Sequence, residues 1–395
     1  MASALFTVAL TSDLHAYSSV LAGERKPSHL CISSTEEPEN HPIVGLLELI
    51  QTQSISADVL LCAGDLGHQA CPEAIKYAWN ALFQVKAALN AGELIATVGN
   101  HDLDSRFIHN VNPIQTLQDL APEFPYRDTT KANQYWSRTY TVVPVGPAVV
   151  VTLNSSATHG YQEQEKNHGR VTPAALSALR KIIEELRNVP IKILLCHHHP
   201  HQHDELNLGP NDVMADGQRL LDLLSKDTSG TWLVVHGHKH HPKISYAAGG
   251  SNAPVVLASG SLCSALFLEL QTEARNQFHT VTFDLDTISR LGLVGRVRSW
   301  YWHCGTGWET SHRGTGLPYE CGFGHRGRPT SMADAIRDEI KNDLRAWNTI
   351  ASKIESVNYM LPQDFDYMRS YLHERHKIKI TDDERGQPFE VSEVV

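Results

Sequence analysis

The chain has 395 residues, of which 41% are hydrophobic and 20% charged, values typical of a globular protein with a sizeable core. Its formal net charge of −10 argues against a broad nucleic-acid surface, which needs clustered Lys and Arg, although a local basic groove remains compatible with it. No run of about 18 apolar residues occurs, so we expect no transmembrane helix and no membrane partner. Seven irregularly spaced cysteines predict free thiols and a cytoplasmic protein.

Short apolar segments alternate with amphipathic ones up to about residue 260, which predicts an α/β fold with largely parallel strands. The predicted strands are 6–11, 59–63, 94–98, 149–153, 191–196, 232–235 and 255–258. The predicted helices are 43–53, 72–89, 173–187 and 218–225. The third of these helices follows Thr172-Pro173, a helix-start signal in which a capping side chain precedes a proline.

Three regions depart from this alternation. Residues 17–41 are polar and are either a lid or a plain surface insertion. Residues 278–308 contain two more predicted strands, 279–285 and 294–302, which we expect to complete a second sheet. From residue 331 onward the pattern is helical, with helices predicted over 332–354 and 364–375.

Five short segments rich in His and Asp stand at the ends of predicted strands. They are Asp13-Leu14-His15, Gly64-Asp65, Gly99-Asn100-His101-Asp102, His197-His198-His199-Pro200 and Gly237-His238-Lys239-His240. Because rigid strands aim the loop residues that follow them, we expect these segments to converge. Chance clustering is the weaker explanation even in a chain with 23 histidines, because order, spacing and strand-end position all agree.

These residue types suit two metal ions that act together. Two cations about 3.5–4 Å apart lower the pKa of a shared water and neutralise phosphoryl oxygens, but they require a bridging carboxylate. We assign Asp65 to that bridge, because Gly64 allows the backbone to approach the metals closely. Asp13 and His15 are two residues apart at a strand end, so their side chains face the same way and can bind one cation.

The remaining ligands come from two other segments. His238 and His240 have the same spacing and can each reach a different cation, and Asn100 adds a neutral amide oxygen. Mixed His, Asp and Asn ligation favours Mn, Fe or Zn over Ca or Mg alone. His101 follows Asn100 and is expected to protonate the leaving group, with Asp102 orienting its imidazole. General acid catalysis of this kind contributes roughly 10²–10⁴-fold.

The ordered segments resemble those of the calcineurin-like metallophosphoesterase superfamily, over about residues 5–260 by motif and to 310 by strand pattern. The resemblance implies a four-layer αββα sandwich of two mixed sheets flanked by helices, with a dinuclear metal centre and a metal-bridging hydroxide as nucleophile. It implies that the first cation is bound by Asp13, His15, Asp65 and His240. The second would be bound by Asp65, Asn100, His238 and one histidine of the fourth segment.

Within that fourth segment the family often has His-x-Pro, which selects His198, with His197 as the alternative. His199 or His201 could then reach the phosphate. The resemblance also matches His101 to the family's proton donor.

Differences between the motifs of this chain and those of related families indicate which branch of the superfamily it resembles most. Serine/threonine phosphoprotein phosphatases carry Gly-Asp-x-Val-Asp-Arg-Gly and Gly-Asn-His-Glu, whereas this chain has Gly64-Asp65-Leu66-Gly67-His68 and Asp102. Purple acid phosphatases have a tyrosine ligand three residues after the bridging aspartate, where this chain has His68. The pattern is most similar to the phosphodiesterase and nuclease branches. His68 itself is either a substrate contact or a surface residue.

Two further groups of residues have less specific patterns. Cys304, Cys321, His303, His312 and His325 could bind a structural zinc, but their spacing is irregular and a loop closing the second sheet is favoured. That aromatic and glycine-rich loop, 301–327, could alternatively stack a base. Arg106 could clamp a phosphate or form a surface ion pair.

We therefore predict a hydrolase that acts on phosphodiester bonds of a cyclic nucleotide or another nucleotide-type diester. A nuclease acting on DNA or RNA ends is the first alternative, and a non-catalytic scaffold with this fold is the second. The predicted domains are a calcineurin-like metallophosphoesterase domain over 1–320 and a mainly helical C-terminal extension over 321–395. The oligomeric state is left open.

Overall fold

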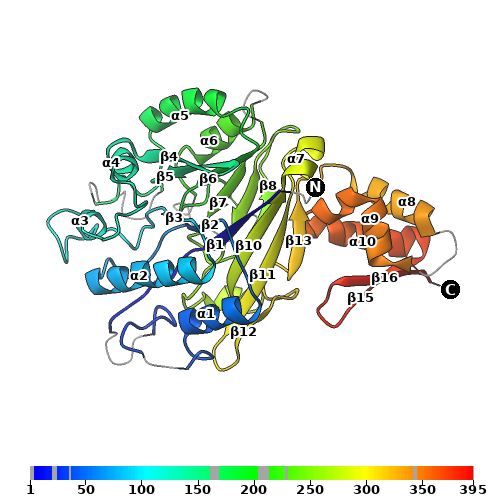
Figure 1. Cartoon of the computed structure of the whole chain (residues 1–395), viewed down its shortest axis with the longest axis horizontal. Helices are drawn as coiled ribbons and strands as arrows, with labels where there is room; N and C mark the ends of the chain where they lie inside the picture. The colour runs from blue at the N-terminus through cyan, green and yellow to red at the C-terminus, as the bar shows by residue number, and fades with distance from the viewer. Residues whose placement is uncertain are drawn as a thin grey trace.

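The computed structural model describes residues 4–19, 25–34, 37–160, 169–202, 213–226, 230–340 and 345–394. Within them, two mixed sheets lie face to face at the centre of the molecule (Figure 1). The first sheet has the order β12-β11-β10-β1-β2-β3, and β13 also pairs with β11. Its strands are β1 (Leu5–Thr11), β2 (Val59–Cys62), β3 (Glu93–Ala96), β10 (Asn276–Asp284), β11 (Gly295–His303), β12 (Gly307–Thr310) and β13 (Glu320–Phe323).

The second sheet has the order β4-β5-β6-β7-β9-β8. Its strands are β4 (Tyr140–Val145), β5 (Ala148–Leu153), β6 (Ile191–Leu195), β7 (Leu233–His236), β8 (Lys243–Tyr246) and β9 (Val255–Ala258). The central strands β5, β6, β7 and β9 are parallel, and the two edges are antiparallel. In the first sheet, β1, β2 and β3 are parallel to one another and β10 is antiparallel to β1.

The two sheets share one hydrophobic core, and alternation along β1 shows why. Phe6, Val8 and Leu10 point into the cluster that also contains Ile193 and Leu195 of β6. The intervening side chains of both strands belong to the outer faces of their sheets, because successive residues of a strand point to opposite sides.

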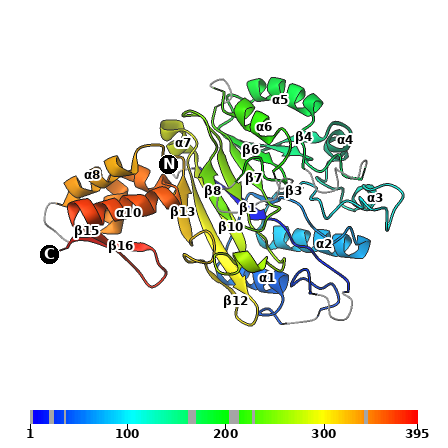
Figure 2. The same ribbon diagram turned by 180° about the vertical axis from the view of Figure 1, so that it is seen from behind.

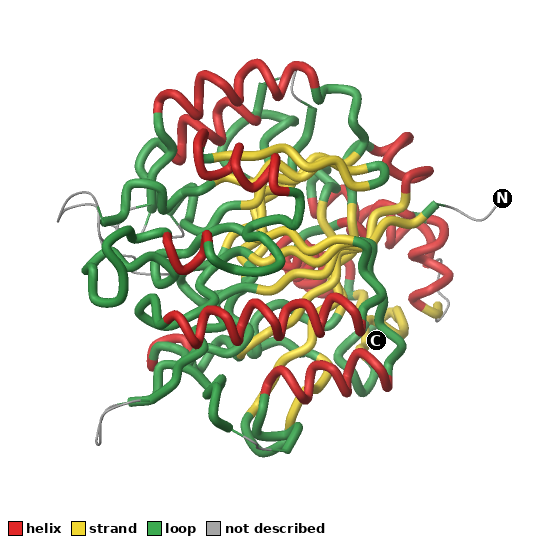
Figure 3. The backbone as a smooth tube through the Cα atoms, turned by 60° about the vertical axis from the view of Figure 1, so that its left-hand side comes forward, coloured by secondary structure: helices red, strands yellow, loops and turns green. Residues whose placement is uncertain are grey.

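Helices cover both outer faces, so that the strands lie between two helical layers (Figure 3). α1 (Pro42–Thr52) and α2 (Pro72–Ala88) pack on the first sheet. Trp79 and Leu82 of α2 belong to the same hydrophobic cluster as Leu60 of β2. α5 (Pro173–Glu185) and α6 (Gly217–Leu224) cover the second sheet. The side chain of Thr172 caps α5 by accepting a hydrogen bond from the Ala175 amide at 3.1 Å, as the sequence predicted. The four-layer αββα fold is therefore confirmed.

Three short helices lie in the connections: α3 (Gln115–Gln118), α4 (Thr129–Arg138) and α7 (Leu285–Leu291). None of the helices in the described ranges is long and apolar enough to cross a membrane.

The C-terminal segment projects from the edge of the sandwich near β13 (Figures 1 and 2). It contains α8 (Pro329–Ile340), α9 (Trp347–Lys353), α10 (Pro362–His376) and a small sheet of β14 (Arg345–Ala346), β16 (Pro388–Glu393) and β15 (Ile378–Asp382). Its helices and strands share a separate hydrophobic cluster. The predicted boundary between residues 320 and 321 falls inside β13, so we propose that the C-terminal unit begins after this strand.

Two predictions about these elements were wrong. The continuous helix over 332–354 is replaced by α8, a pairing strand and α9, with residues 341–344 outside the described ranges. β10 and β11 do not complete the second sheet, because β10 pairs with β1 along most of its length. Part of the predicted 17–41 loop, residues 20–24 and 35–36, also lies outside the described ranges.

Candidate metal centre

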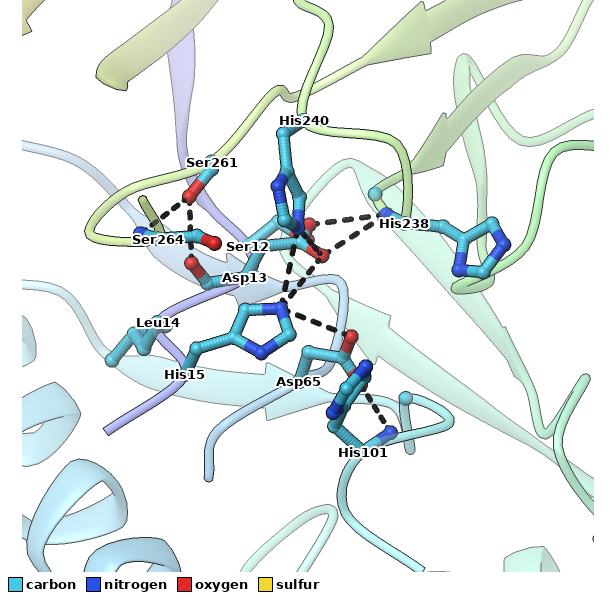
Figure 4. Close-up of polar contacts among 12 residues, drawn as sticks. Ser12, Asp13, Leu14, His15, Asp65, His101, His238, His240, Ser261 and Ser264 are labelled. Atoms are coloured by element: carbon cyan, nitrogen blue, oxygen red, sulfur yellow. Dashed lines mark hydrogen bonds and ion pairs between the residues drawn. The ribbon is translucent and has the colours of Figure 1, made fainter. Parts of the chain in front are cut away.

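The five His- and Asp-bearing segments follow the carboxyl ends of β1, β2, β3, β6 and β7. These strands come from both sheets, so the site lies where the two sheets meet at one end of the sandwich. In Figure 4, His15 lies between Asp13 and His240 on one side and Asp65 and His101 on the other. The five segments therefore converge in the structure, as the sequence predicted.

The backbone of this site is unusual. Five non-glycine residues have φ between 48° and 82°, in the left-handed region that side chains seldom adopt: Asp13, His15, Asp65, His238 and His240. Strained conformations of this kind persist where the surrounding structure enforces them, and they cluster at functional sites. All five are residues for which the sequence predicted metal ligation.

A first set of donor atoms surrounds His15. Its Nε2 atom lies 3.2 Å from Nε2 of His240 and 3.3 Å from Oδ2 of Asp65. Oδ1 of Asp13 lies 3.7 Å from His15 Nε2 and 3.3 Å from His240 Nε2. Atoms that share one cation at bonds of roughly 2.0–2.2 Å are separated by about these distances. The donor set therefore fits a divalent cation.

A second set lies on the other side of Asp65. The same Oδ2 atom that faces His15 lies 3.4 Å from Nε2 of His197. Oδ1 of Asn100 lies 3.0 Å from His197 Nε2 and 2.9 Å from Nδ1 of His238. One carboxylate oxygen of Asp65 thus stands between the two sets, where a bridging ligand would be required.

Of the two candidates in the fourth segment, His197 has the ring nitrogen that faces Asp65, whereas the His-x-Pro pattern selects His198. Nδ1 of His197 is 2.7 Å from the carbonyl oxygen of Ala63, which can only accept a hydrogen bond. This contact keeps a proton on Nδ1, so Nε2, which points at Asp65, is the nitrogen that could bind a metal in place of its own proton. Residues Asp13, Asp65 and His197 form one of the groups whose geometry could hold a metal.

His198 has a different environment. Its Nδ1 is 2.9 Å from the hydroxyl of Ser155, and its ring packs 4.6 Å from the ring of His238. A Cβ atom at Gly169 would lie 2.2 Å from the His198 ring, so the chain closes tightly over it. His198 therefore packs against the ring of His238. His199 is similarly buried, with its ring 4.4 Å from that of His236.

Two glycines allow the segments to come this close. A Cβ at Gly99 would stand 2.0 Å from Oδ1 of Asp65. A Cβ at Gly237 would stand 2.0 Å from Oγ of Ser12 and 2.4 Å from Oδ2 of Asp13. Neither position can carry a side chain without moving a proposed ligand.

Asp102 does not orient the imidazole of His101 as predicted. Its two carboxylate oxygens accept hydrogen bonds from the backbone amides of Asp65, Leu66, Gly67 and Gly99, at 2.6 to 3.2 Å. Asp102 therefore ties the loop after β2 to the loop after β3 and positions Asp65. Burial and the Asp65 carboxylate raise the pKa of Asp102 to about 6.

His101 lies at the mouth of the site. Its backbone amide donates to Oδ1 of Asp65 at 2.8 Å, and its ring centroid lies 4.6 Å from that of His15. The ring of His68 stacks on it at 5.2 Å and 21°. The sequence left open whether His68 is a surface residue, and the structure places it in this cluster. His15, His68 and His101 also form a group whose geometry could hold a metal.

Charge is concentrated among these buried groups. Burial alone would lower the pKa of His15, but the Asp65 and Asp13 carboxylates outweigh it and raise that pKa to about 10. In the same way, Asp65 outweighs burial and raises the pKa of His197 to about 9. The two imidazolium groups in turn hold the pKa of Asp65 well below its usual range despite its burial. The carboxylates thus require nearby positive charge, which divalent cations would supply in place of these protons.

The other predicted groups do not assemble. Within the described ranges, no metal-compatible group contains Cys304, Cys321, His303, His312 or His325. Residues 301–327 instead carry β12 and β13, which close the first sheet. All seven cysteines are free.

Sequence reasoning missed three serines that hold the site. The hydroxyl of Ser12 donates to Oδ2 of Asp13 at 2.5 Å, and Ser261 donates to the Asp13 carbonyl at 2.8 Å. Ser155 accepts from the amides of His197 and His198. Isolated serines carry no spacing signal, so only their position next to Asp13, after β5 or after β9 could have suggested them.

Comparison with known proteins agrees with this geometry. The family model for calcineurin-like phosphoesterases matches residues 6–250. The chain belongs to the calcineurin-like phosphoesterase family. Family membership, together with the groups of Asp and His whose geometry could hold a metal, supports a metal-dependent hydrolase of phosphoesters.

Among solved structures, a purple acid phosphatase from yellow lupin (Lupinus luteus) seeds is similar, with a TM-score of 0.51 and 12% identity. The similarity covers 78% of this chain and 53% of that one, so the chain matches about half of the lupin protein. A dimetal phosphatase from Danio rerio has 12% identity, a TM-score of 0.48 and coverage of 77% and 98%. At these identities the lupin enzyme supports the fold alone. The search of curated proteins found no match.

Proposed function

We propose that this calcineurin-like phosphoesterase is a dinuclear metal phosphodiesterase. The observation that carries the proposal is the position of Asp65 Oδ2, 3.3 Å from His15 Nε2 and 3.4 Å from His197 Nε2. A carboxylate oxygen shared by two sets of donors is the arrangement that a pair of cations needs.

Each set of donors would hold one cation. Asp13, His15 and His240 would bind the first, Asn100, His197 and His238 would bind the second, and Asp65 would be shared. When bound, the cations supply a water of lowered pKa and neutralise the phosphoryl oxygens. The mixed nitrogen and oxygen donors favour Mn, Fe or Zn.

His101 would donate the proton to the departing alkoxide. Burial, which the positive charge of His15 reinforces, lowers the pKa of His101 to about 3 in spite of the attraction of Asp65. Burial thus disfavours the protonated imidazole before substrate arrives. An anionic phosphate beside His101 raises the pKa of its imidazole, so binding of the substrate would favour the protonated form that acts as the acid.

His68 would assist as a second contact to the leaving group. It stacks on His101, and its Nδ1 atom is buried without a hydrogen-bond partner within the described ranges.

The preference for diesters rests on sequence features. Asp102 replaces the glutamate of serine/threonine phosphoprotein phosphatases, and His68 stands where purple acid phosphatases have tyrosine. A nucleotide-type diester remains the proposed substrate class. Nucleic-acid ends are less favoured, because the net charge is −10. The free cysteines support a cytoplasmic location.

The test compares substrates and one substitution. The Mn-loaded protein is expected to hydrolyse bis(4-nitrophenyl) phosphate and a cyclic nucleotide faster than 4-nitrophenyl phosphate, and faster than an oligonucleotide. His101→Gln should lower kcat for the cyclic nucleotide roughly 10²–10⁴-fold, because an alkoxide needs a proton to leave. It should affect 4-nitrophenolate release much less, because that group leaves without a proton.

Metal content of His101→Gln, measured by atomic emission, should match the wild type. Loss of both metals would move His101 from proton donor to ligand. Equal loss with both leaving groups would remove its acid role.

A further inference from the structure

Exposed apolar side chains lie on two segments that reach the metal centre. Phe107, Ile108, Val111, Phe267 and Leu268, which we call the apolar rim, are between 48% and 92% exposed. They make up five of the eleven large hydrophobic residues that are exposed in the described part of the chain. Water-exposed apolar groups that cluster beside a site commonly mark a surface that binds an apolar group.

Both parts of the rim touch the catalytic groups. The ring of Phe267 stacks on that of His240 at 5.4 Å and 15°. On the other side, Ile108 lines a cavity of about 100 Å³ together with His101, Asn100 and Arg106. The rim is therefore continuous with the site on its His240 side and on its His101 side.

Hydrogen bonds hold the loop that carries Phe107 and Ile108 in one conformation. The buried carboxylate of Asp104 accepts hydrogen bonds from the amides of Ile108, His109 and Asn110 at 2.6 to 2.8 Å. Phe107 takes a φ of 54°, a left-handed conformation that this anchor enforces. A loop held in this way keeps its apolar side chains in water when no substrate covers them.

We propose that the apolar rim binds an extended alkyl or acyl substituent of the phosphodiester substrate. The proposal rests on the proposed phosphodiesterase activity and specifies one of the two ester substituents of its substrate, the other being the nucleotide-type group. Ile108, Val111 and Leu268 are aliphatic and offer no side-chain hydrogen bonds, so an aliphatic chain suits them. Arg106 lines the same cavity, and its guanidinium could bind the phosphate there.

The test uses two diesters with one leaving group, 4-nitrophenyl methyl phosphate and 4-nitrophenyl hexyl phosphate, each below its aggregation limit. The Mn-loaded wild type should show a kcat/KM for the hexyl diester at least ~10-fold above that for the methyl diester, because each fully buried methylene contributes about fourfold. The double variant Ile108→Ser, Leu268→Ser should bring this ratio close to one. Ile108 and Leu268 were chosen in place of Phe267, because the ring of Phe267 stacks on the proposed metal ligand His240.

Phe389→Ser is the matched control, because Phe389 is 58% exposed on β16, in the C-terminal segment. It should leave the hexyl-to-methyl ratio at the wild-type value. If the wild type hydrolyses neither diester, the proposed function fails. If it hydrolyses both equally, or if the double variant keeps the wild-type ratio, only the apolar rim proposal is overturned. A flat ratio together with a sedimentation coefficient that falls in the double variant would assign the rim to contact between copies of the chain.

Discussion

At the scale of single residues, His197 and His198 are adjacent in sequence but differ in what holds their rings. The Ala63 carbonyl fixes the proton of His197 on Nδ1, whereas the Ser155 hydroxyl binds Nδ1 of His198. Only the first arrangement directs Nε2 at Asp65.

This difference predicts opposite outcomes for two alanine substitutions. His197→Ala should reduce the bound metal from about two ions per chain to about one and lower kcat at least ~100-fold, because a ligand of the second cation is lost. His198→Ala should keep about two ions, because it removes only packing behind His238. Metal per chain measured by atomic emission decides between them, and the reverse pattern would restore His198 as the ligand.

Because Asp102 binds four backbone amides, we expect its substitution to lower the free energy of unfolding, which the loss of a purely catalytic residue would not do. Asp102→Asn replaces one acceptor by an NH₂ group facing backbone amides. Leaving these buried donors unsatisfied should lower the free energy of unfolding by about 2–4 kcal/mol. Urea titration measures this loss, and Asp119→Asn at an exposed position should change it by less than about 0.5 kcal/mol. An unchanged unfolding midpoint with reduced activity would favour the role predicted from the sequence.

At the scale of elements, the loop after β7 must pass close to the loop after β1. Gly237→Ala would place a methyl group 2.0 Å from Ser12 Oγ and 2.4 Å from Asp13 Oδ2, so we expect it to displace Asp13 and to lower the affinity for the first cation. Titration of the chelated protein with Mn should show this as a Kd at least ~10-fold higher. Gly250→Ala is the control, because a Cβ there meets nothing within 4 Å. Equal affinity of the two variants would contradict the close approach.

The elements that sequence reasoning missed are mostly sheet edges. β4, β8 and β12 each end a sheet, and β13 pairs only with β11. β4 contains Pro144, which cannot donate to a neighbouring strand and is tolerated at an edge. The central strands were predicted because burial on both faces makes them continuously apolar.

The helix predicted over 332–354 failed for a different reason. Met332, Ile336 and Ile340 recur at helical spacing, and so do Trp347 and Ile350. Both runs pack into one C-terminal cluster, but Arg345 pairs with Val391 of β16 between them. Periodicity records which side chains are buried, and it does not record a break between two helices that bury the same face.

At the scale of the whole molecule, the metal centre joins the two sheets. Asp13 and Asp65 follow strands of the first sheet, whereas His197 and His238 follow strands of the second. Cations bound between them would stabilise the folded state, because they bind the assembled site and not the separated segments.

Metal removal should therefore destabilise the protein. Chelation with EDTA is expected to lower the Tm by roughly 5–10 °C, and added Mn should restore it. Differential scanning fluorimetry measures the shift. Asp65→Asn should show little response to either reagent, and a full response in that variant would contradict the bridging role.

The sequence by itself determined the fold class, the central strands and the segments of His, Asp and Asn that converge at one end of the sheets, because each depends on local features. Alternation reports burial, and a polar residue directly after a buried strand reports the strand end. Only the tertiary structure decided that Nε2 of His197 faces Asp65, that Asp102 binds the loop after β2 and that His68 stacks on His101. These outcomes depend on which backbone atom of a distant segment lies within hydrogen-bonding distance, and the spacing of residues along a chain carries no record of that.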